Sequence, residues 1–278
     1  MNLRSVFARV FRAGGKTVSK VRRIDKSAIR AAVHARVEAL ESRELFSTYF
    51  VSPWGNDGAS GTSEGAAWKS IGRVNAQQLR GGDTVLFQGG QTFWGSIQVM
   101  AEEGGTNFGS FGNGRATIQS GGSAGLDVGQ TAGVSVRNMN FVGSGMYNNN
   151  ASGIWFHANW ANRGLSGITI DQVDVQGYGG YDVKIEAPGW GSSFSNVRIT
   201  NAFLHNSLKG GLWINAYAHN VNKNIYVGYV WSWNHPGNGS TSEVTGSGIC
   251  VFDSQNAVIE RSIAHSNGQN GAAPVGIW

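Results

Sequence analysis

Two sets of side chains in three short apolar segments combine aromatic rings with groups that transfer protons or form hydrogen bonds. The segments begin at Ile154, Val183 and Leu212, and in each one apolar residues alternate with residues of other types. The intervening residues are Trp155, Lys184 and Trp213 in the first set and His157, Glu186 and Asn215 in the second. Because alternate residues of a strand face the same side, we expect these six side chains to share one outer surface.

Such a surface offers two kinds of chemistry. Indole rings present flat apolar faces on which the C–H faces of a sugar stack, so the predicted substrate-binding residues are Trp155, His157, Trp213 and Asn215. A lysine beside a glutamate can perform acid–base catalysis. The candidate catalytic residues are Lys184, Glu186, Lys209 and His205.

A lyase that acts on a uronic acid needs a base, here Lys184, Lys209 or His205, and a cation that neutralises the substrate carboxylate. Ca²⁺ is a candidate cofactor for that second task, because it binds carboxylate oxygens. Its candidate ligands are Asp171, Asp174 and Asp182, and Glu186 is a further one. A glycoside hydrolase needs instead two carboxylates at a defined separation, for which Asp171 and Asp174 are candidates.

A non-catalytic interpretation stays open beside these. Lys184 and Glu186 are two residues apart on a strand, and an exposed pair of this kind contributes little to stability or chemistry. His205 precedes a turn asparagine and can simply pack there. No complete catalytic motif is present, so the sequence leaves open a lyase, a hydrolase or a surface protein that only binds.

These segments belong to a repetitive region that covers residues 117–278. Residues 168–187 align without a gap on residues 197–216, and five units begin at Val134, Ile168, Val197, Ile225 and Val258, with the register of the last unit open by one residue. A unit of this size cannot bury its apolar face alone, so units must stack at about one strand spacing, roughly 4.8 Å. Three asparagines recur after the first strand of a unit and predict a ladder of stacked amides, namely Asn206, Asn234 and Asn267.

The segment before the repeats carries a resemblance to a known group of proteins. Residues 49–71 and 79–93 read YFVSPWGNDGASGTSEGAAWKSI and LRGGDTVLFQGGQTF. They are similar to the opening of right-handed parallel β-helix repeat proteins of the pectate-lyase-like superfamily, a resemblance that extends over residues 49–278. It implies an all-β solenoid whose first coil is covered by a short amphipathic helix around Trp68, Ile71, Val74 and Leu79. It also implies a polysaccharide partner, because polysaccharide lyases and glycoside hydrolases belong to this group.

Residues 1–47 differ from the rest in charge and pattern. They hold 11 of the 22 basic residues but 4 of the 17 acidic ones, so residues 48–278 carry 11 basic and 13 acidic side chains. A nucleic-acid-binding domain needs a basic face, and we expect no nucleic-acid partner. Ile29, Val33, Val37 and Leu40 lie on one stripe of a predicted helix.

Residues 40–46 resemble the LEPR-XLL segment of large exported bacterial proteins, with Ser42 in place of its proline and Phe46 in place of its last leucine. This resemblance implies an exported product, at the cell surface or outside the cell, although residues 1–25 contain no apolar run typical of a signal peptide. No stretch approaches the 18 or so apolar residues of a membrane span.

We therefore predict two parts, a basic and partly helical segment over residues 1–47 and a right-handed parallel β-helix over residues 48–278. Gly276 and Ile277 align with the start of the second strand of earlier units, which predicts an incomplete C-terminal coil and a fragment of a longer protein. Cys250 is the single cysteine, so an intrachain disulfide is impossible.

Overall fold

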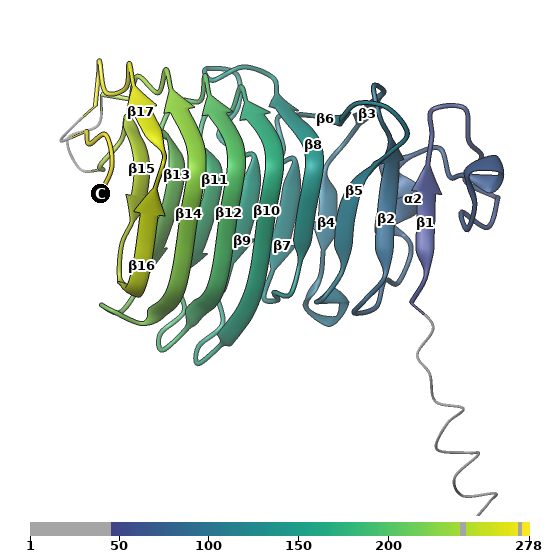
Figure 1. The fold of residues 1–278 in the computed structure, drawn as a ribbon, viewed down its shortest axis with the longest axis horizontal. Helices are drawn as coiled ribbons and strands as arrows, with labels where there is room; N and C mark the ends of the chain where they lie inside the picture. Colours follow the sequence, from purple (N-terminus) through teal and green to yellow (C-terminus); the bar gives the residue numbers. More distant parts are fainter. Residues whose placement is uncertain (1–45, 240–242, 272–273) are drawn as a thin grey trace, which may run out of the picture. The chain divides into compact units, whose positions relative to one another are not determined.

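The strands that pair in the described part of the chain all pair in parallel, in two sheets (Figure 1). The computed structural model describes residues 46–239, 243–271 and 274–278. The helix predicted before residue 46 and most of the segment similar to LEPR-XLL lie outside these residues. Within the described residues, no helix is long and apolar enough to cross a membrane.

Sheet A, the larger sheet, contains eleven strands. They are β1 (Thr48–Val51), β2 (Thr84–Gln88), β3 (Thr92–Trp94), β5 (Asn107–Phe111), β6 (Ala116–Gly121), β8 (Ser135–Gly143), β10 (Gly164–Gln176), β12 (Ser193–His205), β14 (Asn222–Trp233), β16 (Ser254–Glu260) and β17 (Ile263–His265). Sheet B contains six strands. They are β4 (Ile97–Val99), β7 (Leu126–Gly129), β9 (Ile154–His157), β11 (Tyr181–Ala187), β13 (Gly210–Ala216) and β15 (Ser247–Val251).

The chain alternates between the two sheets. After β10 it crosses to β11 in sheet B and returns to β12, which pairs with β10. Each circuit thus adds a strand to each sheet beside the strand of the previous circuit, and Figure 1 shows these circuits side by side, with sheet A in front of sheet B. This arrangement confirms the predicted parallel β-helix.

Inward side chains of successive coils stack into columns that form the core. Ile154, Val183, Leu212 and Ile249 are in register in sheet B, and each is at most 1% exposed. Burial of one such side chain contributes about 1.5–3 kcal/mol to folding. In sheet A the predicted units begin in register at Val134, Ile168, Val197 and Ile225, whereas Ala257 rather than Val258 continues this column. The fifth unit therefore begins one residue earlier than Val258, within the one-residue slip that the sequence left open.

The long strands of sheet A bend where backbone φ is positive. One bend passes through Asn138, Gln172, Asn201, Tyr229 and Arg261, with φ between 49° and 57°. A second bend occurs at the end of the strands, at Asn206, Asn234 and Ser266, with φ between 54° and 59°. Asparagine tolerates this left-handed conformation better than most residues, which explains its frequency at the bends.

The predicted amide ladder is correct for two of its three members. The side-chain amide of Asn234 donates to Asn206 Oδ1 over 2.6 Å. Asn267 does not join this ladder, because His265 pairs with Trp233 and Ser266 therefore takes the third position. The carboxamide oxygen of Asn267 instead accepts a hydrogen bond from the backbone of His235.

A short helix covers the first coil, as the resemblance implied, but this helix does not extend over all of the residues from Trp68 to Leu79. Helix α2 spans Ile71–Asn75 and buries Ile71 and Val74, with the Ser70 side chain accepting a hydrogen bond from Arg73 N at its start. Trp68 lies before the helix, pairs with Val51 as an isolated bridge and is fully buried. The apolar residues predicted for one helix therefore all contribute to the cap, although only two of them are helical.

Candidate functional site

The outer face of sheet B holds the two predicted sets of side chains in the predicted register. Lys184 on β11 pairs with Trp155 on β9 and with Trp213 on β13. Glu186 pairs with His157 and Asn215 on the same two neighbouring strands. The parallel pairing thus brings together six residues that are spread over 61 positions of the sequence, from Trp155 to Asn215.

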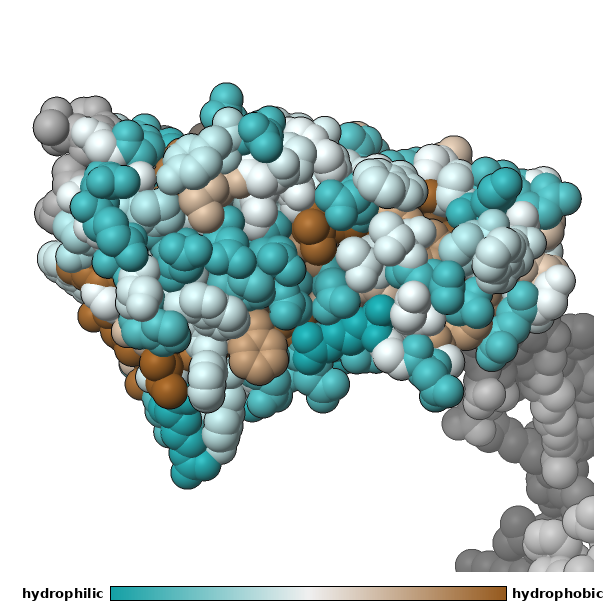
Figure 2. All heavy atoms as spheres, turned by 90° about the horizontal axis from the view of Figure 1, so that it is seen from above, coloured by the Kyte–Doolittle hydropathy of each residue, from teal (hydrophilic) through white to brown (hydrophobic). Residues whose placement is uncertain are grey.

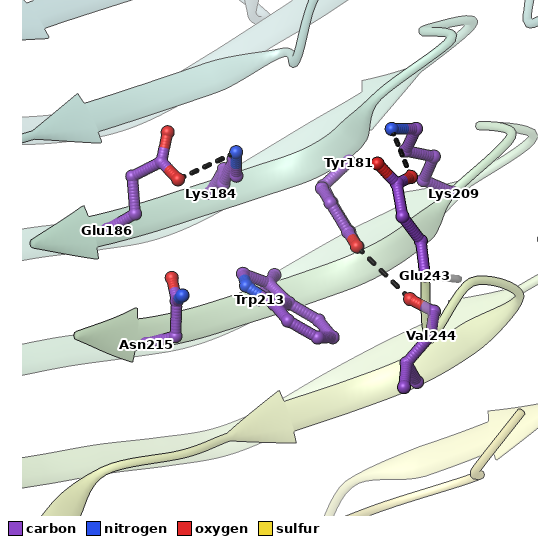
Figure 3. Close-up of a pocket in the computed structure, with 8 residues that line it drawn as sticks. All are labelled: Tyr181, Lys184, Glu186, Lys209, Trp213, Asn215, Glu243 and Val244. Carbon is purple, nitrogen blue, oxygen red and sulfur yellow. Dashed lines mark hydrogen bonds and ion pairs between the residues drawn. The ribbon is translucent and has the colours of Figure 1, made fainter. Parts of the chain in front are cut away.

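A pocket of about 380 Å³ opens over β11 and β13 on this face (Figure 3). Its lining consists of Tyr181, Lys184, Glu186, Lys209, Trp213, Asn215, Glu243 and Val244. Strand residues provide its floor, and the segment that precedes β15 provides Glu243 and Val244. We call this cavity the sheet B pocket.

Two aromatic rings form one wall of the sheet B pocket. Tyr181 and Trp213 stack with their ring centroids 5.1 Å apart and their planes at 30°. The Tyr181 hydroxyl donates to the carbonyl of Val244 over 3.3 Å, and burial raises the pKa of this phenol, so that it stays protonated. Within the described residues, the indole N–H of Trp213 has no hydrogen-bond acceptor. A ligand can therefore contact both an apolar ring and an unused donor here.

Each lysine of the sheet B pocket is paired with a glutamate. Lys184 Nζ lies 2.8 Å from Glu186 Oε2, and the other oxygen of Glu186 accepts a hydrogen bond from the Trp155 indole over 2.8 Å. Lys209 Nζ lies 2.6 Å from Glu243 Oε2, and this lysine lowers the pKa of Glu243. The charges of the pocket are therefore balanced at neutral pH.

A second, smaller pocket of about 230 Å³ adjoins the first, because Lys184 lines both. Its lining consists of Ala124, Asp127, Asn150, Ala151, Ser152, Trp155 and Lys184. The Asn159 amide donates to His157 Nδ1 over 3.0 Å, so the imidazole proton is on Nε2 and donates to Asp127 over 2.9 Å. The two pockets together form what we call the sheet B groove, which follows the stack of coils from β7 to β13.

The remaining predicted site residues are not all at this groove. Lys209 lines the sheet B pocket, but His205 lies at the end of β12 in sheet A, where its ring bonds to Asp174 over 3.1 Å. Asp171, also in sheet A, accepts hydrogen bonds from Thr200 and Asn201. Both hydrogen bonds, with nearby Arg137, help to lower its pKa although partial burial opposes them.

The proposed Ca²⁺ ligands do not converge on one point. Asp171 and Asp174 lie on the outer side of sheet A, whereas Asp182 points into the core and is completely buried. The part of the chain that the structure describes contains no group of three or more His, Cys, Asp or Glu side chains placed to hold a metal ion. These residues therefore do not fit a shared calcium site.

The sequence pattern missed several lining residues. Tyr181 lies one residue before the buried Asp182, at the start of β11, where the alternation was not yet visible. Glu243 and Val244 belong to the connection after β14, and Asp127 to a coil before the clear repeats. Periodicity positions strand residues only, so no signal in the sequence placed the connection over the pocket. Cys250 continues the outer set in register but is fully buried, so it does not contribute to the surface.

Comparison with known proteins supports the fold. No protein-family model and no curated protein matches the sequence. A GH136 lacto-N-biosidase from Eubacterium ramulus, as its selenomethionine derivative, matches with a TM-score of 0.59 and 17% identity over 82% of this chain and 47% of that chain. The native form matches with a TM-score of 0.46 and 16% identity over 84% of this chain and 53% of that chain. The chain thus spans about half the length of these structures, and at this identity the likeness concerns the fold.

Proposed function

We propose that this protein is glycan-active and binds a sugar chain in the sheet B groove, in the manner of a β-helix glycoside hydrolase. The observation that carries the proposal is the sheet B pocket, where the Tyr181–Trp213 stack faces two lysine–glutamate pairs across adjacent coils. Ligand pockets combine apolar walls with a few polar groups that orient the ligand. A pyranose ring has the same combination, with C–H faces and a hydroxyl edge.

The charge balance favours a neutral glycan over a uronic acid polymer. A lyase needs a positive charge available to the substrate carboxylate, but Lys184 and Lys209 each already pair with a glutamate. A hydrolase needs two carboxylates, and Glu186 and Glu243 both line the pocket. The likeness in fold to a lacto-N-biosidase agrees with hydrolysis. In this proposal Lys184 and Lys209 hold the carboxylates, and Trp155, His157, Trp213 and Asn215 contact the sugar.

One observation favours a binding protein without catalysis as the second candidate. Both oxygens of Glu186 are engaged, one by the Trp155 indole and one by Lys184. A carboxylate held by two partners is less available for attack or proton transfer. Substitution of both carboxylates, Glu186→Gln with Glu243→Gln, separates the candidates, because a hydrolase loses turnover while a binding protein has none to lose.

Replacement of Trp213 by alanine tests the proposal directly. Removal of the ring that stacks on Tyr181 is expected to weaken binding of neutral oligosaccharides about tenfold, since one aromatic contact contributes roughly 1 kcal/mol beyond its burial. Isothermal titration calorimetry against a panel of neutral and uronate oligosaccharides measures this. Trp190→Ala is the matched control, because Trp190 is an exposed tryptophan in the turn after β11. Unchanged affinity in Trp213→Ala, or tighter binding of uronates than of neutral sugars, contradicts the proposal.

The proposed substrate lies outside the cytoplasm, and the segment similar to LEPR-XLL supports export to the cell surface or medium. Fractionation of cells that produce the full-length protein, with detection by antibody, tests this location. Recovery of the protein only in the cytoplasmic fraction contradicts it.

A further inference from the structure

A second aromatic surface lies on sheet A and thus on the other sheet than the groove. Figure 1 shows the strands of sheet A that carry it, β12, β14 and β17. It occupies the ends of β12, β14 and β17, where outward side chains form two adjacent columns. The first column contains Phe203, Trp231 and Ile263, and the second contains His205, Trp233 and His265. Asp174 and Gln176 on β10 extend the two columns by one coil. We call these eight residues the sheet A aromatic face.

The rings of this face are held in fixed orientations. His205 lies flat on Trp233, with centroids 4.2 Å apart and planes at 8°, and His265 continues the stack at 6.1 Å and 7°. Phe203 stands nearly perpendicular to Trp231 and to Trp233, at 80° and 76°. A rigid array loses little conformational entropy when a ligand binds.

Much of this array is open to solvent. Phe203, Trp231 and Ile263 are 38%, 46% and 44% exposed. Among the residues that the structure describes, neither Trp231 nor Trp233 has an acceptor for its indole N–H. Figure 2, which looks down on the ends of these strands, shows hydrophobic groups beside hydrophilic ones near the C-terminal coils. The face thus offers apolar surface and unused donors together.

The size of the apolar strip fits a narrow ligand better than a second copy of the chain. Three side chains of this size that are less than half exposed present on the order of 250 Å² of surface. A stable protein–protein interface requires about 800 Å² from each partner. The second column adds one further apolar ring, Trp233, which lies between His205 and His265.

The polar groups of the face do not form a cationic surface. The Asn206 amide donates to His205 Nδ1 over 2.8 Å, so Nε2 carries the proton and donates to Asp174 over 3.1 Å. The carboxylate of Asp174 keeps one oxygen for a hydroxyl donor. The eight residues of the face include no Lys or Arg that would attract a uronate chain, a phosphate or a nucleic acid, and the adjoining Arg261 is bonded to the Tyr229 hydroxyl.

We propose that the sheet A aromatic face is a second glycan-binding surface, which takes a single chain of a neutral polysaccharide along the stack of coils. Its sugar rings contact Phe203, Trp231 and Ile263, and its hydroxyls bond to the Trp231 and Trp233 indoles and to Asp174. This surface would tether the protein to a polymer while the sheet B groove engages another segment or chain. The proposal stands on residues that the groove does not use.

Affinity electrophoresis tests this proposal with the full-length protein in gels that contain hydroxyethyl cellulose, xyloglucan, galactomannan or polygalacturonate. At least one of the three neutral polymers is expected to retard the wild type. The double variant Phe203→Ala/Trp231→Ala is expected to raise the dissociation constant about fivefold or more for that polymer. Trp190→Ala is the control for loss of an exposed tryptophan, and Trp213→Ala reports on the sheet B groove in the same gels.

Each other outcome overturns the proposal. These outcomes are no retardation of the wild type by any neutral polymer, the same retardation of the double variant as of the wild type, and retardation by polygalacturonate alone. Analytical ultracentrifugation adds a further one, because a wild-type dimer that the double variant abolishes would make the face a self-interface. Circular dichroism verifies that the variant is folded, and Trp231→Tyr, which keeps a ring, should retain most of the affinity.

Discussion

At the scale of single residues, β11 carries two carboxylates four positions apart with opposite surroundings. Glu186 faces outward and is held by Lys184 and Trp155. Asp182 faces the core, where Ser207 donates to its Oδ1 and where Oδ2 has no hydrogen-bond partner among the described residues. Burial raises the pKa of Asp182 well above its usual value. Residues four apart share a face in a regular strand, so β11 departs from alternation at its start, where Tyr181, Asp182 and Val183 are all buried. This departure keeps Asp182 neutral, whereas Glu186 has a charged partner.

The group that faces Asp182 is also neutral. His235 is fully buried, with Nδ1 2.9 Å from the carbonyl of Ser207 and Nε2 3.3 Å from the carbonyl of Leu204. A neutral imidazole has one N–H, and it donates to the closer carbonyl, that of Ser207. Its Nε2 lies 3.5 Å from Asp182 Oδ2. Burial lowers the pKa of His235 to about 4, with a further contribution from the nearby His205. A protonated Asp182 that faces a neutral His235 satisfies both pKa shifts and gives the orphaned oxygen a hydrogen to donate.

This pair predicts a specific pH dependence of stability. The pKa of His235 is about 6.5 in the unfolded protein and about 4 in the folded protein. The stability that the neutral imidazole contributes is therefore lost as pH falls through this range. The pKa of Asp182 is raised, so its contribution is present below its unfolded value of 3.8 and is lost as pH rises through the folded pKa. The two trends oppose each other between pH 4 and 6.5.

Asp182→Asn separates these trends, because an amide imitates the protonated acid but does not titrate. In the variant only His235 of this pair titrates, so the free energy of unfolding should fall by up to roughly 3 kcal/mol from pH 6.5 to pH 4. In the wild type the opposite trend of Asp182 offsets part of this loss, so the loss should be steeper in the variant. Its stability relative to the wild type should rise with pH. Urea unfolding at several pH values measures both, with the exposed Glu64→Gln as control. Parallel pH profiles for variant and wild type would contradict a neutral pair.

At the scale of the elements, a second amide ladder holds a further position of positive φ, near the start of the long strands of sheet A. Asn224 donates to Asn196 over 3.1 Å, and Asn256 donates to Asn224 over 3.3 Å. All three have φ between 53° and 57°. The asparagine ladder predicted from the sequence lies only at the turn after the strand, because a residue inside an extended strand shows no turn signal. Conformation and hydrogen bonding together therefore select asparagine at this position.

Substitution of Asn224 separates these two causes. Asn224→Ala loses the ladder and leaves a β-carbon in the left-handed region without the polar side chain that lets asparagine tolerate it, which costs about 1–2 kcal/mol. Asn224→Gly loses the ladder alone, and the side chain is exposed, so we expect a loss below about 1 kcal/mol. The free energy of unfolding in urea should therefore be lower for alanine than for glycine. Equal losses would show that the backbone conformation is not the reason for asparagine here.

The sequence predicted the elements well where burial fixes them and poorly where it does not. Val183 and Leu212 had to point inward and stack, so the outer set that includes Lys184 and Trp213 followed from alternation. The fifth unit was placed one residue late because Val258 is more hydrophobic than Ala257, whereas the register there follows Asn256 on Asn224. Glu243 and the Asp182–His235 pair depend on how connections fold over or into the coils, which periodicity does not encode.

At the scale of the whole stack, the two proposed binding surfaces share the same coils. The sheet B pocket is built on β11 and β13, and the sheet A aromatic face is built on β12 and β14, which alternate with them along the chain. Phe156, Ile185 and Ile214 form a core column on the inner side of β9, β11 and β13, and each is 0% exposed. In a stack of repeats each coil is stabilised mainly by its neighbours, so a defect in this column acts on both surfaces.

Ile185→Ala tests this coupling. The cavity it leaves is expected to lower the free energy of unfolding by about 2–5 kcal/mol, while the affinity of each surface without denaturant stays close to that of the wild type. With increasing urea, tryptophan fluorescence and retention on a neutral polysaccharide should be lost at one midpoint, because neither surface persists without the coils it shares with the other. Val51→Ala, at the first strand and equally buried, is the matched control for a core defect far from both surfaces. Two separate midpoints in Ile185→Ala, one for tryptophan fluorescence and one for retention on the polysaccharide, would mean that the coils unfold independently.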